Sequence, residues 1–151
     1  MSDTAEGTPR MTRSRRQHVR TVRNIGTIGI LAGGILSTTG AVVWGLISAE
    51  LTAQKITVSP DSKLLPERPV RGPLTAYAQA EIINTHATAI SDGKTFAELP
   101  QDDPNRAVIM NASFLRASLF TSVVSFGTAA FAIGLGLVTS LFGIALRRLG
   151  K

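Results

Sequence analysis

Two stretches of the chain carry no charged residue, and a longer, more polar segment separates them. The first covers residues 24–48 and the second covers 117–146. Each exceeds the roughly 20 apolar residues that a helix needs to cross a hydrocarbon layer of about 30 Å. We therefore predict an all-α membrane protein in which the two stretches are transmembrane helices, paired as a helical hairpin with a small helical extracytoplasmic segment.

Basic residues flank this pattern at both ends and predict its orientation. Arg20 and Arg23 precede the first stretch, and Arg147 and Arg148 follow the second. Because basic flanks stay in the cytoplasm, we expect a multi-pass protein of the plasma membrane with both termini cytoplasmic. The predicted segments are a disordered basic tail (1–23), transmembrane helix 1 (24–48), an extracytoplasmic linker with helices (49–116), transmembrane helix 2 (117–146) and a second basic tail (147–151).

A removable export signal is the alternative interpretation of the first stretch. Arg15 and Arg16 partly resemble a twin-arginine motif, and Ile47-Ser48-Ala49 offers small residues for cleavage. An apolar signal core runs only about 7–15 residues, so the length favours a membrane anchor. Trp44, near the end of this stretch, is expected either at the level of the lipid headgroups or packed on a neighbouring helix.

Small residues recur at every third or fourth position through both stretches. In lipid, helices associate through close approach of their backbones, which small residues permit. The predicted packing residues are Gly29, Gly33, Ser37, Ala41 and Gly45 in the first stretch, and Ser125, Ala129, Ala132, Gly136, Ser140 and Gly143 in the second. This pattern is compatible with packing of the two stretches on each other and with self-association of copies.

The intervening segment predicts short helices joined by an irregular linker. Prolines between residues 60 and 73 favour the linker. A narrow apolar stripe at helical spacing predicts a helix over 75–90, and it consists of Ala76, Ala80, Ile83, Ala87 and Ile90. The sequence from Thr95 to Glu98 resembles a capping box. Asp103 as N-cap and Pro104 as first helical residue predict a helix that continues unbroken into the second stretch.

Composition limits the chemistry that the chain can perform. It has no cysteine and two histidines, His18 and His86, which the topology places on opposite sides of the membrane. A site with two histidines and a carboxylate cannot form in one copy, and neither stretch contains an ionisable residue for a proton relay. We expect no enzyme activity, cofactor or metal. The net charge of +6 is attributed to topology, so the expected partners are the lipid bilayer and other membrane proteins or copies of the chain, with no nucleic acid.

Three motifs carry a resemblance to a known family. They are AYAQA at 76–80, GKT with AEL over 93–99, and NASFLRASL at 111–119. With them, residues 53–148 resemble small actinobacterial two-span membrane proteins, which are often labelled aromatic ring-opening dioxygenases. The resemblance implies an integral protein of the cell envelope and assigns no activity to any residue. The separated histidines argue against the dioxygenase label.

These observations favour a non-enzymatic accessory or scaffold protein. Its candidate outer contact surface consists of Tyr77, Gln79, Lys94, Asn111 and Arg116, with a purely structural helical brace as the simpler role for these residues. An oligomeric pore lined by the serines and threonines of the two stretches is one alternative. A sensor facing the envelope is the other.

Overall fold

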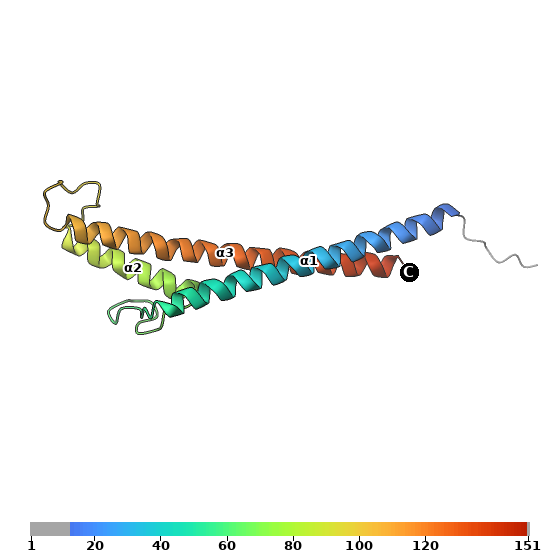
Figure 1. The fold of residues 1–151 in the computed structure, drawn as a ribbon, viewed down its shortest axis with the longest axis horizontal. Helices are drawn as coiled ribbons and strands as arrows, with labels where there is room; N and C mark the ends of the chain where they lie inside the picture. Colours follow the sequence, from blue (N-terminus) through green and yellow to red (C-terminus); the bar gives the residue numbers. More distant parts are fainter. Residues whose placement is uncertain (1–12, 151) are drawn as a thin grey trace, which may run out of the picture. The chain divides into compact units, whose positions relative to one another are not determined.

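The computed structural model describes residues 13–150, which form three helices: α1 (Arg13–Ala53), α2 (Pro73–Ile90) and α3 (Arg106–Leu149) (Figure 1). Within this range the backbone forms no β-strand, and an isolated antiparallel bridge joins Thr57 to Pro69. The chain divides into two compact units. Among the described residues, the first unit comprises 13–37 and 134–150, and the second unit comprises Thr38–Ile133.

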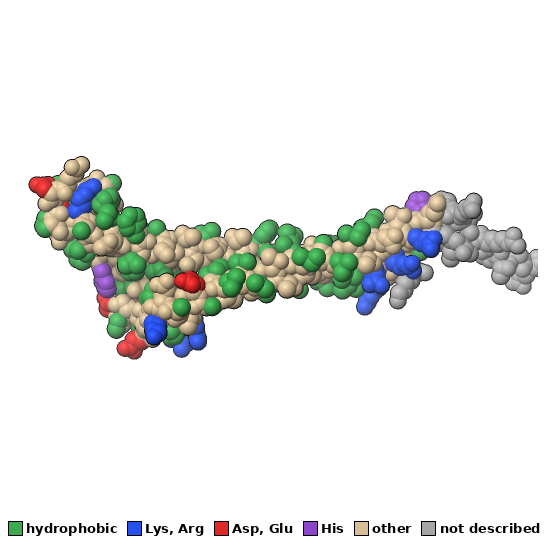
Figure 2. Space-filling model, in the orientation of Figure 1, with side chains coloured by type: hydrophobic (Ala, Val, Ile, Leu, Met, Phe, Trp, Pro, Cys, Tyr) green, Lys and Arg blue, Asp and Glu red, His purple; other side chains and the backbone are tan. Residues whose placement is uncertain are grey.

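Both long helices are apolar enough to cross a membrane. The qualifying segments are Gln17–Ala53 and Arg106–Leu149. In the most apolar 18-residue window of each, only 11% and 17% of the residues, respectively, are buried inside the structure. Their apolar side chains therefore face outward, and Figure 2 shows hydrophobic side chains following one another along these helices.

The N-terminal tail differs from the prediction. Residues 13–23, which we expected to be disordered, form the first turns of α1, while residues 1–12 lie outside the described residues. Arginine and glutamine are good helix formers, and no glycine or proline separates Arg13 from Asn24, so the helix has no reason to begin later. At the other end, α3 includes Arg147 and Arg148 in its last turn.

In the first unit, α1 and α3 pack backbone to backbone at glycines. A Cβ atom built on Gly26 would lie 2.6 Å from the carbonyl oxygen of Gly143, and one built on Gly136 would lie 2.7 Å from the backbone nitrogen of Ser37. Real Cβ atoms do not approach other atoms closer than 3.0 Å. Gly33 faces Gly136, so rising numbers on α1 meet falling numbers on α3, and the two segments are antiparallel. We call this contact the glycine seam.

The seam brings together only part of the predicted packing face. Gly29 and Ser37 lie against α3, and Ser140 faces Gly33. Ala41 and Gly45, in contrast, are exposed, and a Cβ built on Gly45 meets nothing within 4 Å.

The helical repeat explains this difference. Four residues exceed one turn of 3.6 residues by about 40°, so a stripe of every fourth residue rotates roughly 160° around α1 between Gly29 and Gly45. Contacts seven residues apart, close to two turns, stay on one face. They include Gly26 and Gly33 in the first unit and Gly40 in the second, where Gly40 meets Ala129 and Ile133 of α3. Sequence reasoning missed Gly26 and Gly40.

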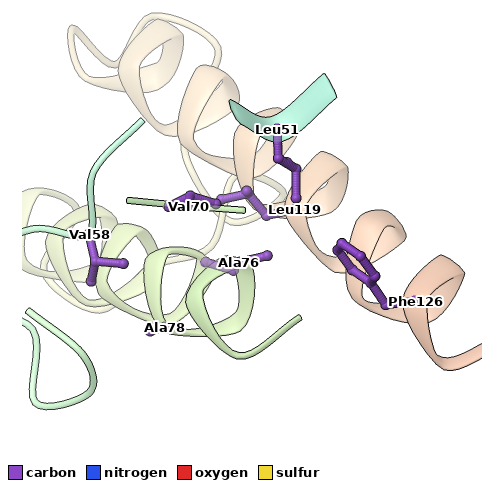
Figure 3. Close-up of a cluster of buried hydrophobic side chains, with 8 residues drawn as sticks. Leu51, Val58, Val70, Ala76, Ala78, Leu119 and Phe126 are labelled. Carbon is purple, nitrogen blue, oxygen red and sulfur yellow. The ribbon is translucent and has the colours of Figure 1, made fainter. Parts of the chain in front are cut away.

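The second unit has a hydrophobic core of small and large residues (Figure 3). Its members are Leu51 of α1, Val58 and Val70 of the linker, Ala76, Ala78 and Ala80 of α2, and Leu119 and Phe126 of α3. Trp44 packs edge-on against Phe126, with ring centroids 4.8 Å apart, so its ring contacts a neighbouring helix.

Helix α2 is buried on more than one side. The predicted stripe included Ala76, Ala80 and Ile90, but Ile90 is 46% exposed and Ala78 is fully buried. Residues two apart on a helix point about 200° from each other. Burial of Ala76, Ala78 and Ala80 therefore means that the linker and the long helices cover different faces of α2.

Capping residues define the connection between α2 and α3. The Glu98 carboxylate accepts hydrogen bonds from the backbone N–H and the hydroxyl of Thr95, at 2.8 and 2.7 Å. Asp103 Oδ1 accepts from the backbone N–H of Asn105 at 2.8 Å. A turn occupies Pro104 and Asn105, so α3 begins at Arg106, two residues later than predicted, and then continues unbroken to Leu149.

Arg106 fastens this connection to the start of α3. Its Nη1 donates to the carbonyl oxygens of Phe96, Leu99 and Pro100, and its guanidinium stacks 4.3 Å from the centre of the Phe96 ring. One side chain therefore satisfies three backbone acceptors in a segment without regular secondary structure.

Replacing one seam glycine will weaken the helix pair. We expect Gly136→Ala to destabilise the folded protein by about 1–3 kcal/mol through overpacking. Gly134→Ala, on the same helix with open space around it, should be neutral or stabilising by up to about 1 kcal/mol through helix propensity. Unfolding of both variants in a denaturing detergent titration measures this difference, and equal effects would contradict the seam.

Candidate functional site

A cavity of about 670 Å³ lies between the three helices of the second unit. This volume falls within the range of about 300–1,000 Å³ typical of small-molecule sites. The lining residues are Leu46, Ile47, Glu50, Leu51, Gln54, Ile56, Gln79, Ile83, Leu115, Ser118, Leu119, Thr121, Ser122 and Ser125. The predicted packing residue Ser125 thus lines this cavity.

Three hydroxyl groups of this cavity, those of Thr121, Ser122 and Ser125, donate to their own helix. Thr121 donates to the carbonyl of Ala117 at 2.9 Å, and Ser125 donates to the carbonyl of Thr121 at 2.8 Å. Such bonds leave only oxygen lone pairs for a ligand. Glu50 is the one charged residue of the lining, and Gln54 Nε2 lies 3.5 Å from its Oε1 atom. The cavity is therefore mainly apolar, with acceptors along one wall.

Two residues of the predicted contact surface meet on Phe120. Tyr77 of α2 packs edge-on against this ring, with centroids 5.9 Å apart, and the Arg116 guanidinium lies 5.3 Å from the ring centre. The Arg116 Nε atom is buried and has no hydrogen-bond partner, while Tyr77 keeps 40% of its surface exposed. Aromatic and arginine side chains of this kind are enriched at protein interfaces.

The other three predicted surface residues have separate positions. Gln79 Oε1 accepts a hydrogen bond from the backbone N–H of Ser59 at 3.1 Å, so this side chain holds the linker against α2. Lys94 and Asn111 are exposed and take no part in the contacts around Phe120. The structure therefore groups Tyr77 with Arg116 and assigns Gln79 a structural contact.

An acid–histidine pair that sequence reasoning missed ties the linker to α2. His86 Nε2 lies 2.6 Å from Asp61 Oδ2, and the Ser59 hydroxyl donates to Asp61 Oδ1 at 2.6 Å. The hydrogen bonds from Ser59 and from His86 hold the pKa of Asp61 below its ordinary value. The side chain of His86 is 49% exposed. Its partner lies 25 residues away, with no periodic pattern to reveal it.

The order of these groups limits their chemistry. In a hydrolase triad the histidine lies between the serine and the acid, where it takes the serine proton. Here Asp61 lies between Ser59 and His86, so the imidazole does not take the place next to the serine hydroxyl. In the part of the chain that the structure describes, no three histidine, aspartate or glutamate side chains form a group that could hold a metal ion. The hydrogen bonds of Asp61 with Ser59 and His86 join the linker to α2, and we call these three residues the polar latch.

Comparisons of the chain with protein-family models, with curated proteins and with solved structures gave no match. What the protein does is therefore inferred from its own contacts, exposure and charge.

The latch will lose its stabilising effect in acid. A lowered folded-state pKa means that ionised Asp61 stabilises the fold above its ordinary pKa of 3.8, and that this contribution disappears as pH falls through the lower folded value. We expect Asp61→Asn to lower the thermal midpoint slightly at neutral pH, with a deficit that shrinks below about pH 3.8. Circular dichroism melts across this range measure it. The exposed control Asp102→Asn should show no such deficit, and a constant deficit at all pH values would contradict the latch.

Proposed function

We propose that the chain is a non-enzymatic integral membrane protein that acts as an accessory or scaffold subunit of the cell envelope. In this proposal α1 and α3 cross the bilayer as a hairpin with both termini in the cytoplasm. The second unit then presents α2 and its linkers at the outer membrane surface. The observation that carries the proposal is the outward exposure of apolar side chains along both long helices.

The exposed residues are too large and too numerous for a water-facing helix pair. Leu31, Ile35, Phe131 and Leu141 are each more than 60% exposed. Burial of such a side chain is worth about 1.5–3 kcal/mol, and contiguous apolar surface on a monomer marks a membrane or protein contact. A bilayer supplies the missing burial along the full length of both charge-free stretches.

The glycine seam supports a hairpin over self-association through small residues. Gly26, Gly33, Gly136 and Gly143 already contact the other helix of the same chain. A second copy would have to separate that pair before it could use the same glycines. Contacts with other proteins must therefore use the outward apolar faces or the second unit.

The second unit offers a surface suited to a protein partner. Tyr77 is 40% exposed, and it meets Arg116 on the ring of Phe120 in α3. The buried Arg116 Nε lacks an acceptor, and an unmade hydrogen bond of a charged group costs free energy. Because this atom is itself buried, a partner would bind the other donors of the half-buried Arg116 guanidinium, which match a carbonyl or carboxylate, and such a contact supports an accessory role.

The proposed topology can be tested with engineered cysteines, because the natural chain has none. We expect Lys94→Cys to react with a membrane-impermeant maleimide on intact cells, and Leu149→Cys to react only after permeabilisation. Both variants should stay in the membrane fraction after alkaline extraction. Labelling of Leu149→Cys on intact cells, or release of the protein by alkali, would contradict the hairpin.

The proposed contact surface can be tested by photo-crosslinking in cells. A photoreactive amino acid at Tyr77 should give a discrete adduct with a second protein, and the same group at the exposed control Gln101 should give none. Arg116→Ala should reduce the adduct by about tenfold, because a hydrogen bond to a charged group is worth about 1.5–3 kcal/mol. Equal adducts at both positions, or none at Tyr77, would contradict an accessory role for this surface.

A further inference from the structure

A second cavity, of about 530 Å³, opens where the end of the first charge-free stretch meets the linker and the start of α2. Its wall contains Trp44 of α1, Leu65, Arg68 and Arg71 of the linker, and Leu74 of α2. Two guanidinium groups therefore line a space that also has an aromatic ring and two leucine side chains.

The linker is fixed at this cavity by backbone hydrogen bonds. Val58 donates to the carbonyl of Arg68 at 2.9 Å, and Val70 donates to the carbonyl of Ile56 at 2.8 Å. Val70 is only 1% exposed, so the residues on either side of it are held in place. Arg68 and Arg71 are both exposed and thus remain available for a ligand.

The cavity carries uncompensated positive charge. Its lining contains no aspartate or glutamate. In the described part of the chain the ion pair is that of His86 with Asp61, so neither arginine is paired with a carboxylate. The planar guanidinium group matches the geometry of phosphate oxygens and binds them with two parallel hydrogen bonds. An anion with phosphate chemistry is therefore the ligand that fits this wall.

The apolar part of the wall distinguishes a lipid from free phosphate. Trp44 lies four residues before the end of the charge-free stretch, the depth at which indole rings sit among lipid headgroups. Leu65 and Leu74 are 38% and 72% exposed, which is costly in water but favourable against acyl chains. A ligand that contacts both the arginines and the apolar residues of this cavity has a phosphate group and a hydrocarbon tail.

We propose that this cavity binds the phosphodiester headgroup of an anionic phospholipid in the leaflet where α1 ends. Arg68 and Arg71 contact the phosphate, Trp44 lies beside the glycerol region, and the two leucines contact the upper acyl chains. The inference rests on the proposed membrane location, and it adds a lipid preference that a hairpin alone would not have.

Trp44 is the only tryptophan of the chain, so its fluorescence reports the lipids at this cavity. The full chain is reconstituted in phosphatidylcholine vesicles that contain either brominated phosphatidylglycerol or brominated phosphatidylcholine in the same proportion. Bromine quenches tryptophan at short range. We expect phosphatidylglycerol to be preferred about 25-fold at this site, because each of the two arginines attracts anionic lipid with a factor of about five.

The double variant Arg68→Gln with Arg71→Gln should lose this preference and quench equally with both lipids. The matched control Lys55→Gln with Lys94→Gln removes the same charge from outside the cavity and should keep it. An equal loss in the control would show a general charge effect and overturn the proposal. So would equal quenching in the unmodified chain, or displacement of the brominated lipid by inorganic phosphate.

Alkaline extraction of the same vesicles separates this inference from the proposed function. If the chain is released, the membrane hairpin itself is wrong. If every variant stays inserted and retains its helical circular dichroism but no lipid is preferred, only the headgroup site is wrong.

Discussion

The contact between glycine backbones on α1 and α3 is the constraint on which the long helices depend. Apolar side chains gain nothing by leaving lipid for another apolar surface, so the association of membrane helices depends on close packing and dispersion contacts. Glycine weakens an isolated helix by about 1 kcal/mol relative to alanine. The chain accepts that cost at Gly26, Gly33, Gly136 and Gly143, where a side chain would overlap the opposite backbone.

The size of the contact residues changes within the second unit. Gly40 still meets α3 at backbone distance, but the next contact on α1 is the indole of Trp44 against Phe126. Large rings keep helices further apart than glycines do, and the space created is taken by the alanine-rich α2 and by the cavities beside it. The alanines at 76, 78 and 80 let α2 be covered closely from several sides. Glycines at the contact thus give closely packed helices, and the larger residues that follow give a unit with internal cavities.

Features set by neighbouring residues could be predicted from the sequence. The helical class, the two long apolar helices and the turns at Thr95–Glu98 and Asp103 depend on local spacing and capping. They appear where the pattern indicates, although α1 begins at Arg13, well before the apolar stretch that starts at residue 24. The side of α1 that packs could not be read from every fourth position, because it depends on the rotation accumulated over several turns. The pair of Asp61 with His86 and the grouping of Arg68 with Trp44 depend on how the linker folds back. No periodicity encodes that path.

The hydrogen bonds from Arg106 to the backbone between Phe96 and Pro100 limit how the length of this connection can change. Three carbonyl groups accept hydrogen bonds from one guanidinium group, whose side chain has a fixed length. An insertion or deletion here would therefore move some of these carbonyl groups out of hydrogen-bond distance. Most surface connections tolerate insertions. The connection between α2 and α3 should instead keep its number of residues. Its residue types can still change, provided that Arg106 and the three carbonyl groups stay within hydrogen-bond distance.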